Sequence, residues 1–377
     1  MKILTVIGAR PQFIKAATVS REVLKRQNDG VDIEEVIVHT GQHFDANMSD
    51  IFFEQMRIPK PDYNLEVHSL GHGAMTGQML EKIEKVLLDE QPDWVLVYGD
   101  TNSTLAGALA AKKLHIRVAH VEAGLRSFNM AMPEEVNRIM TDRISDLLFC
   151  PTATAVSNLQ AEGFGGDARG FGSIVRSGDV MQDAAMFYAA LSEKPGIDFD
   201  LDSPFILTTI HRAENTDDPE RLQSIFEALQ TIAEKTPLIL PLHPRTRAKL
   251  TALGIRSLHD RLIIIDPVGY LEMVYLLTHC ALVMTDSGGL QKEAFFFEKP
   301  CITLRDETEW TELVEHGFNL LTGADRNTII DASEKMLRHK QLFDERKPEL
   351  YGNGNASGII VDALLKNQCK PNSDSTE

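Results

Sequence analysis

The sequence is short of basic residues and has no long apolar run. It contains 38 lysines and arginines against 55 aspartates and glutamates, which gives a formal net charge of −17. Nucleic acids and anionic membrane surfaces are bound through basic patches, so this balance argues against both as partners. No stretch approaches the roughly 20 consecutive apolar residues of a membrane span. The amino terminus also lacks the pattern of a signal peptide, and we expect a cytoplasmic protein.

Closely spaced cysteines and the common cofactor motifs are lacking as well. Cys150, Cys280, Cys301 and Cys369 form no C-x-x-C pair, so neither a zinc knuckle nor a disulfide framework is indicated. The chain has no G-x-x-x-x-G-K-[ST], H-E-x-x-H or G-x-S-x-G motif. The segment 163–168 matches G-x-G-x-x-A, but it follows a helical run where a dinucleotide fingerprint would follow a strand. We therefore expect no metal and no cofactor.

What the sequence does have is a regular alternation of short apolar runs with amphipathic stretches. At 377 residues the chain exceeds what one hydrophobic core usually organises, which predicts two domains. Runs typical of buried parallel strands occur in two series, at 3–7, 35–39, 94–98, 118–121 and 147–150, and then at 205–209, 238–240, 262–265, 282–285 and 301–304. Helical spacing between the runs predicts an α/β fold with a doubly wound parallel sheet in each half.

The two series also set the expected domain boundaries. We expect an N-terminal domain over 1–170 and a C-terminal domain over 205–354. The glycine-rich, polar and proline-containing region between them predicts a linker at 171–204. A final helix near 355–368 is expected to pack back on the first domain.

Polar residues concentrate in the loops that follow the strands, where open α/β sheets bind their ligands. After the first strand comes G-A-R-P-Q at 8–12, with Lys15 in the helix behind it. Backbone N–H groups at a helix start, together with Arg10 and Lys15, would favour a phosphate. The alternative is a simple strand-to-helix turn that carries two solvated cations.

Three carboxylates follow strands of the same half. Asp100 comes after 94–98, Glu122 ends the next strand, and Glu134 lies in the loop beyond. An aspartate in this position often only caps a helix, and a glutamate after Pro133 is typical of a first helical turn. Glu122 closes an apolar strand and needs a partner there, which favours a functional role.

The second half places cations and glycines after its strands. His211 and His243 each lie near an arginine, an arrangement that we interpret as a diphosphate contact rather than as two structural histidines. Ser287, Gly288 and Gly289 then present backbone amides at a helix start, and Glu293 follows in that helix. Amides suit a phosphate and a carboxylate suits ribose hydroxyls, although a plain glycine turn is the alternative.

Taken together, five ordered motifs resemble the non-hydrolysing UDP-N-acetylglucosamine 2-epimerase family. They are G-A-R-P-Q at 8–12, G-D-T at 99–101, H-V-E-A-G-L-R at 120–126, P-E-E-V-N-R at 133–138 and D-S-G-G at 286–289. The resemblance runs over most of the chain. It implies two Rossmann-like domains that face a cleft, as in GT-B glycosyltransferases, with UDP held mainly by the second domain and a homodimer as the usual assembly.

The resemblance also implies roles for individual residues. The catalytic set of the family matches Asp100, Glu122, Glu134 and His211. Its UDP and substrate contacts match Arg10, Lys15, His243, Ser287, Gly288, Gly289 and Glu293. In some relatives a second, activating UDP-sugar binds near residues that match Gln42 and His43.

Departures from the commonest family pattern bear on the substrate. Many members that act on UDP-GlcNAc have G-T-R-P-E and T-E-R-P-E where this chain has G-A-R-P-Q at 8–12 and T-E-W-T-E at 308–312. R-S-F at 126–128, H-R-A-E-N at 211–215 and G-D-V-M at 178–181 make the chain more similar to the branch that acts on UDP-2,3-diacetamido-2,3-dideoxyglucuronate. Conversion of UDP-GlcNAc to UDP-ManNAc is the alternative. A GT-B glycosyltransferase or a UDP-sugar binding protein is a more distant one.

The chemistry of carbon 2 limits the possible routes. This carbon is not α to a carbonyl, so its proton is too weakly acidic to be removed and simply replaced. Oxidation of a neighbouring carbon would need NAD, for which no credible fingerprint exists. The remaining route eliminates UDP to give a 2-acetamidoglucal and adds it back. That route needs carboxylates as acid and base, and cations on the departing diphosphate.

Overall fold

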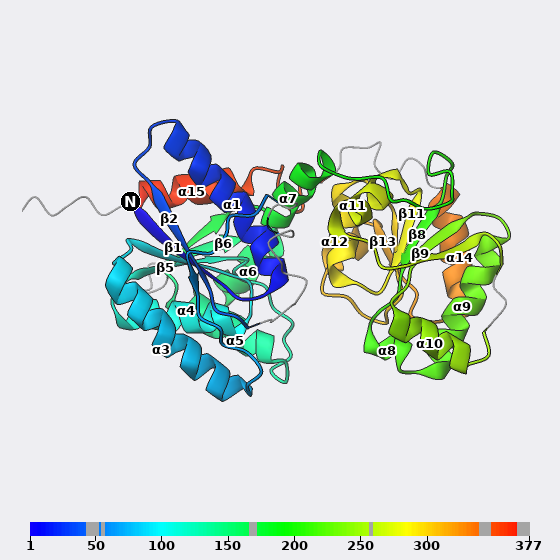
Figure 1. Ribbon diagram of the computed structural model, residues 1–377, viewed down its shortest axis with the longest axis horizontal. Coiled ribbons are helices and arrows are strands. Elements are labelled where there is room, and N and C mark those ends of the chain that lie inside the picture. The colour runs from blue at the N-terminus through cyan, green and yellow to red at the C-terminus, as the bar shows by residue number, and fades with distance from the viewer. Residues whose placement is uncertain (43–52, 54–56, 166–171, 256–258, 339–347, 368–377) are drawn as a thin grey trace, which may run out of the picture. The chain divides into compact units, whose positions relative to one another are not determined.

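The structure is a computed structural model, described over residues 1–42, 53, 57–165, 172–255, 259–338 and 348–367 (Figure 1). The chain divides into two compact units. The first comprises Met1–Ala184 together with Glu349–Glu377, and the second comprises Ala185–Pro348. Among the described helices, none combines the length and apolar character that a membrane crossing requires.

The first unit is built on a seven-stranded sheet with the order β3-β2-β1-β4-β5-β6-β7. Its strands are β1 Lys2–Ile7, β2 Glu34–His39, β3 Tyr63–Asn64, β4 Trp94–Tyr98, β5 Arg117–Val121, β6 Leu147–Cys150 and β7 Ser173–Arg176. All neighbouring strands are parallel. The central strand β4 is buried at every position, because helices cover both faces of the sheet.

Helices cover this sheet on both sides. They are α1 Arg10–Asn28, α3 His72–Glu90, α4 Asn102–Lys113, α5 Pro133–Ile144, α6 Ala153–Ala161 and α15 Ala356–Lys366. The amino-terminal part of α7 Val180–Ala189 also belongs to the first unit. The helices α1 and α15 pack together on one face, and α3, α4 and α5 lie on the other (Figure 1). Gly107 lets α4 approach β1 closely, since a Cβ there would lie 3.1 Å from the side chain of Val6.

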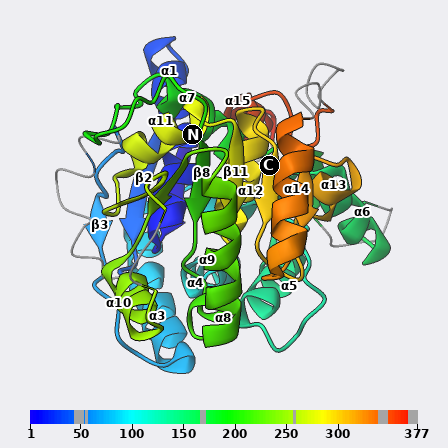
Figure 2. The same cartoon turned by 90° about the vertical axis from the view of Figure 1, so that its right-hand side faces the viewer.

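The second unit is built on a six-stranded sheet with the order β10-β9-β8-β11-β12-β13. Its strands are β8 Ile206–Thr209, β9 Leu238–Pro241, β10 Leu262–Ile265, β11 Leu282–Thr285, β12 Cys301–Thr303 and β13 Asn319–Leu321. Its helices are α8 Ala213–Thr216, α9 Pro219–Ala233, α10 Pro244–Ala252, α11 Tyr270–His279, α12 Gly288–Phe296, α13 Thr311–Glu315 and α14 Arg326–Arg338. The pair α9 and α14 covers one face with one apolar core, and α11 and α12 contribute to a second core on the other face (Figure 2).

The α/β class with two doubly wound parallel sheets, predicted from the sequence, is confirmed. The region predicted as a linker differs, because 171–204 contains β7 and α7. Strand β7 extends the first sheet by pairing with β6, and the chain leaves the first unit only after Ala184. After Pro348 the chain returns, and α15 packs on α1 in the first unit.

Candidate active site

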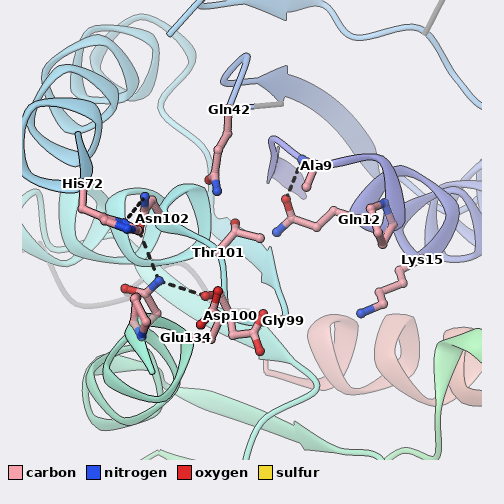
Figure 3. A pocket seen from close by; sticks show the side chains of 13 residues that line it. Ala9, Gln12, Lys15, Gln42, His72, Gly99, Asp100, Thr101, Asn102 and Glu134 are labelled. Atoms are coloured by element: carbon pink, nitrogen blue, oxygen red, sulfur yellow. Dashed lines mark hydrogen bonds between the residues drawn. The ribbon is translucent and has the colours of Figure 1, made fainter. Parts of the chain in front are cut away.

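The loops after β1, β4 and β5 meet at one edge of the first sheet, because the carboxyl ends of parallel strands lie together. A cavity of about 260 Å³ lies at this edge (Figure 3). Side chains that line it include Lys15, Gln42, His72, Asp100, Asn102 and Glu134. The structure therefore brings several of the residues predicted from separate motifs to a single cavity.

Asp100 occupies the turn after β4 and remains 35% exposed. Its carboxylate forms an ion pair with Arg138 of α5, and Asn137 Nδ2 donates to its main-chain oxygen at 2.9 Å. Burial raises the pKa of Asp100, since it outweighs the attraction of Arg138 and Lys15, and the charges of Glu122 and Glu134 raise it further. The other two carboxylates predicted from the sequence thus interact electrostatically with Asp100. A raised carboxyl pKa is typical of a group that exchanges a proton during a reaction.

Glu122 lies just behind the cavity wall, at the end of β5. Its carboxylate forms a buried ion pair with Lys15, and it also lies against Gly99. The backbone at Glu122 has a φ of +69°, a left-handed conformation that strains a residue with a side chain. Burial alone would lower the pKa of Lys15, but the charge of Glu122 and its hydrogen bond raise it overall. The partner that this strand-end carboxylate requires is therefore Lys15.

Glu134 lies at the exposed start of α5, directly after Pro133, and lines the cavity. Its neighbour Glu135 is buried and accepts hydrogen bonds from the amides of Ser127 and Phe128, each at 2.9 Å. Arg138 Nη2 lies 2.7 Å from Glu135 Oε2, so Arg138 joins Glu135 to Asp100. No role was predicted for Glu135, Asn137 or Arg138, although their spacing on one helical turn was a visible signal.

The turn at 8–12 differs from the anion site that its sequence predicts. Gln12 Oε1 accepts hydrogen bonds from the amides of Gly8 at 2.8 Å and Ala9 at 3.0 Å, and its Nε2 donates to Tyr98 O. These two amides are therefore occupied by a side chain of the protein itself. Contacts of Arg10 and Lys15 with substrate stay a prediction.

Gln42 lies on the opposite side of the cavity from α5 (Figure 3). Its side-chain oxygen accepts from Ser103 N at 3.0 Å and from Ser103 Oγ at 2.8 Å, which fixes the amide against the start of α4. His43 lies outside the described residues. A contact with a second UDP-sugar stays a prediction for both residues.

In the second unit, Asp286 organises the loop that carries His211. The fully buried carboxylate accepts hydrogen bonds from the amides of His211 and Arg212 and from Asn215 Nδ2. His211 Nδ1 also lies 3.2 Å from Asp286 Oδ1, while 57% of the imidazole side chain is exposed. Burial by itself would raise the pKa of Asp286, but these hydrogen bonds and the histidine lower it. A carboxylate that orients an exposed imidazole was not predicted.

The turn at Ser287, Gly288 and Gly289 starts α12. Ser287 is the N-cap residue of this helix, and Trp310 Nε1 donates to the carbonyl of Gly288 at 2.9 Å. A Cβ on Gly288 would lie 2.3 Å from Glu309 Oε1, whereas a Cβ on Gly289 would meet only Ser287 Oγ, at 4.0 Å. The room at Gly289 favours close approach of a ligand to the backbone at the positive end of a helix.

Glu293 and His243 complete the residues predicted for the second unit. Glu293 is buried in α12 and accepts a hydrogen bond from Tyr270 Oη at 2.8 Å, and burial raises its pKa to about 7. His243 caps α10, because its Nδ1 accepts from Arg245 N at 3.2 Å. His243 therefore has a capping role in this helix, and its contact with a ligand stays a prediction. In the described part of the chain, no cluster of three or more His, Cys, Asp or Glu residues is able to hold a metal.

Two Rossmann-like parallel sheets, with polar residues gathered at the carboxyl ends of their strands, define an α/β protein of the GT-B-like class. The chain belongs to the UDP-N-acetylglucosamine 2-epimerase family, whose model matches residues 24–365. The predicted family and its isomerase class are therefore confirmed.

Individual relatives match over nearly their whole length. A UDP-2,3-diacetamido-2,3-dideoxy-D-glucuronate 2-epimerase of Pseudomonas aeruginosa is 58% identical, over 97% of this chain and 100% of the relative. The solved structure of UDP-GlcNAc 2-epimerase from Methanocaldococcus jannaschii is 42% identical, with a TM-score of 0.84 over 97% of this chain and 100% of that one. The Neisseria meningitidis enzyme bound to UDP-GlcNAc is 34% identical, with a TM-score of 0.82 and the same coverage.

Proposed function

We propose that the protein inverts carbon 2 of UDP-2,3-diacetamido-2,3-dideoxyglucuronate, giving the manno epimer without hydrolysis, for surface polysaccharide synthesis. The reaction is inferred mainly from the group of three carboxylates at one edge of the first sheet, where burial and then the charges of Glu122 and Glu134 raise the pKa of Asp100. The 58% identity to the Pseudomonas aeruginosa enzyme of that name supports the substrate.

The proposed reaction moves one proton and one leaving group. A base takes the proton from C2, a double bond forms between C1 and C2, and the C1–O bond breaks with its electron pair leaving on UDP. Re-addition reverses these steps, with the proton delivered to the opposite face of the 2-acetamidoglucal. Asp100, Glu122 and Glu134 supply the acid and base groups in this proposal.

The nucleotide is assigned to the second unit. The amides of the turn at Ser287, Gly288 and Gly289 and the exposed imidazole of His211 suit a diphosphate. The carboxylate of Glu293 suits ribose hydroxyls. Because the acid and base groups belong to the first unit, turnover requires both units.

One incubation tests the reaction. The protein is mixed with UDP-2,3-diacetamido-2,3-dideoxyglucuronate in D₂O, and carbon 2 is followed by NMR. We expect deuterium at C2 and a mixture of two epimers that both retain UDP. Release of free sugar would indicate a hydrolysing enzyme, and no exchange at C2 would leave a binding protein or a transferase.

UDP-GlcNAc is the second candidate substrate, because the relatives at 42% and 34% identity carry its name. We expect kcat/KM to be at least tenfold higher for the diacetamido-glucuronate, since a site built for extra polar groups discriminates strongly against an analogue that lacks them. A higher kcat/KM for UDP-GlcNAc would reverse the assignment.

Two further properties implied by the resemblance stay predictions. We propose that the protein forms a homodimer, which sedimentation velocity at micromolar concentration tests directly. A cytoplasmic location is tested by fractionation of the source cells.

A further inference from the structure

His120 is a fully buried histidine of β5 that contacts two hydrogen-bond acceptors. Its Nδ1 lies 2.7 Å from Asp142 Oδ1, and its Nε2 lies 2.7 Å from the carbonyl oxygen of Gly99. A carbonyl oxygen only accepts, so Nε2 must carry a hydrogen. Asp142 holds the other ring nitrogen, so the imidazole is fixed at both of its polar atoms.

Asp142, which holds the His120 ring, is itself fixed on its other side. Its second oxygen accepts from Gly124 N at 3.1 Å and from Arg126 Nη1 at 2.7 Å. The position of the ring is therefore tied to the turn after Glu122 and to the side chain of Arg126.

Arg126 is held in turn by Glu162. Two hydrogen bonds of 2.6 and 2.8 Å join them, and the side chain of Arg126 is only 1% exposed. His120, Asp142 and Arg126 therefore form a buried cluster of hydrogen-bonded side chains with a fixed geometry.

The cluster joins the two turns that carry the reacting carboxylates. Gly99, whose carbonyl His120 holds, directly precedes Asp100 on the cavity wall and has a φ of +63° (Figure 3). Gly124, whose amide Asp142 holds, follows the strained turn at Glu122 by two residues. His120 and Asp142 thus fix both turns through main-chain atoms, from behind the cavity.

We propose that His120 is a positioning residue, held between Asp142 and the Gly99 carbonyl, that fixes this carbonyl and thereby places the carboxylate of Asp100. The effect on turnover rests on the proposed function, in which Asp100 exchanges a proton with the substrate. The hydrogen bond from His120 to Gly99 does not rest on it, so the two are tested separately.

The first test measures the hydrogen bond to Gly99 in the wild-type protein. In protein labelled with ¹⁵N-histidine, Nε2 of His120 should carry a hydrogen that is protected from exchange because the ring is buried. The signal is assigned by its nuclear Overhauser effect to the α protons of Gly99. A bare Nε2 would overturn the proposal, whatever the enzyme proves to catalyse.

The second test separates positioning from stability with two variants. His120→Gln can still donate to the Gly99 carbonyl from the position of Nε2, whereas His120→Asn keeps only the bond to Asp142. We expect kcat to fall about 10²-fold in His120→Asn, as for a misplacement near 1 Å. In His120→Gln it should fall at least tenfold less, even if the melting temperature is equal or lower. KM should change little in both, since the nucleotide is assigned to the other unit.

If kcat in the two variants followed the melting temperature and not the bond to Gly99, His120 would have only a structural role. If neither variant folded, the NMR measurement on the wild-type protein would decide the hydrogen bond to Gly99 on its own. A normal rate for Asp100→Asn with an intact Nε2–H signal would refute the proposed role of Asp100 and leave the contact of His120 with Gly99 standing.

Discussion

At the scale of single residues, we expect Glu293 to make nucleotide binding dependent on pH. Burial raises its pKa to about 7, although the hydrogen bond from Tyr270 and the charge of Lys292 lower it. If ribose hydroxyls donate to this carboxylate, as proposed, UDP should bind the deprotonated protein. The affinity for UDP should therefore rise with pH, level off above about 7, and weaken by up to tenfold per pH unit below that value.

Isothermal titration with UDP between pH 5.5 and 8.5 measures this profile. Glu293→Gln should remove the midpoint near 7. Tyr270→Phe is the matched variant, because it removes a hydrogen bond that lowers the pKa of Glu293 and should move the midpoint to higher pH. An unchanged midpoint in both variants would show that another group titrates.

Asp100 offers a second test at this scale. Asp100→Asn keeps the shape of the side chain but removes its ability to exchange a proton. We expect kcat to fall by about 10²-fold or more, as for loss of a general acid or base. The dissociation constant for UDP should stay within twofold of the wild-type value. Asp89→Asn, on the exposed end of α3, is the control for loss of one negative charge from the same unit. A near-normal rate for Asp100→Asn would remove this residue from the catalytic set.

At the scale of elements, two adjacent glycines at the start of α12 differ in the space around them. A methyl group at Gly288 would displace Glu309, which forms an ion pair with Arg305 at 2.8 Å. Gly288→Ala should therefore lower the free energy of unfolding by about 1–3 kcal/mol. At Gly289 a methyl group would meet only Ser287 Oγ, at an ordinary contact distance of 4.0 Å, so Gly289→Ala at this helical position should raise the free energy of unfolding by about 0.4–1 kcal/mol.

Chemical denaturation of the two variants checks these opposite signs. The same proteins also report on the ligand, because Gly288→Ala should weaken UDP binding by displacing the turn. Equal stability of the two variants would mean that Glu309 moves aside at no cost.

Elements with strong apolar runs could be predicted from the sequence, and short edge strands could not. The central strands β1, β4, β5, β8 and β11 are buried on both faces of their sheets. Their runs of mainly apolar residues are the signal from which they could be predicted. Strand β7 reads S-I-V-R and is only partly buried, and β3 has two residues. Such edge strands owe their conformation to pairing with a neighbour, which local sequence does not record.

The same limit applies to the site. Asp100, Glu122 and Glu134 could be predicted to converge, because the carboxyl ends of parallel strands share one edge of a sheet. The hydrogen-bond acceptor of the Gly8 and Ala9 amides could not be predicted, because it is the side chain of Gln12 in the following helix. Spacing likewise shows which face of α5 carries Arg138, but the loop that this face meets is set by the packing of the whole unit.

At the scale of the whole molecule, the first unit is completed by the last described helix of the chain. Ile360 on α15 is fully buried, and Asp362 forms a surface ion pair with Arg26 at 2.9 Å. Ile360→Ala should lower the free energy of unfolding by about 2–5 kcal/mol, because it leaves a cavity in the core. Asp362→Ala should lower it by less than about 1 kcal/mol, because the ion pair is exposed to solvent.

Thermal unfolding with and without UDP measures both changes. The proposal assigns the nucleotide to the second unit, so UDP should raise the melting temperature of the transition in which that unit unfolds. Ile360→Ala, in the first unit, should leave this transition unchanged. An Ile360→Ala protein as stable as the wild type would show that α15 contributes little to the first unit.

The first unit is built from two separate segments of the chain, and these are synthesised at different times. A ribosome completes all of the residues from Ala185 to Pro348 before it begins α15, so the second unit can fold while the first still lacks its closing helix. Until translation ends, the side of α1 that α15 covers stays open to water and to chaperones. A truncated chain that ends before Ala356 would therefore contain the whole second unit but would lack the helix that covers α1 in the first.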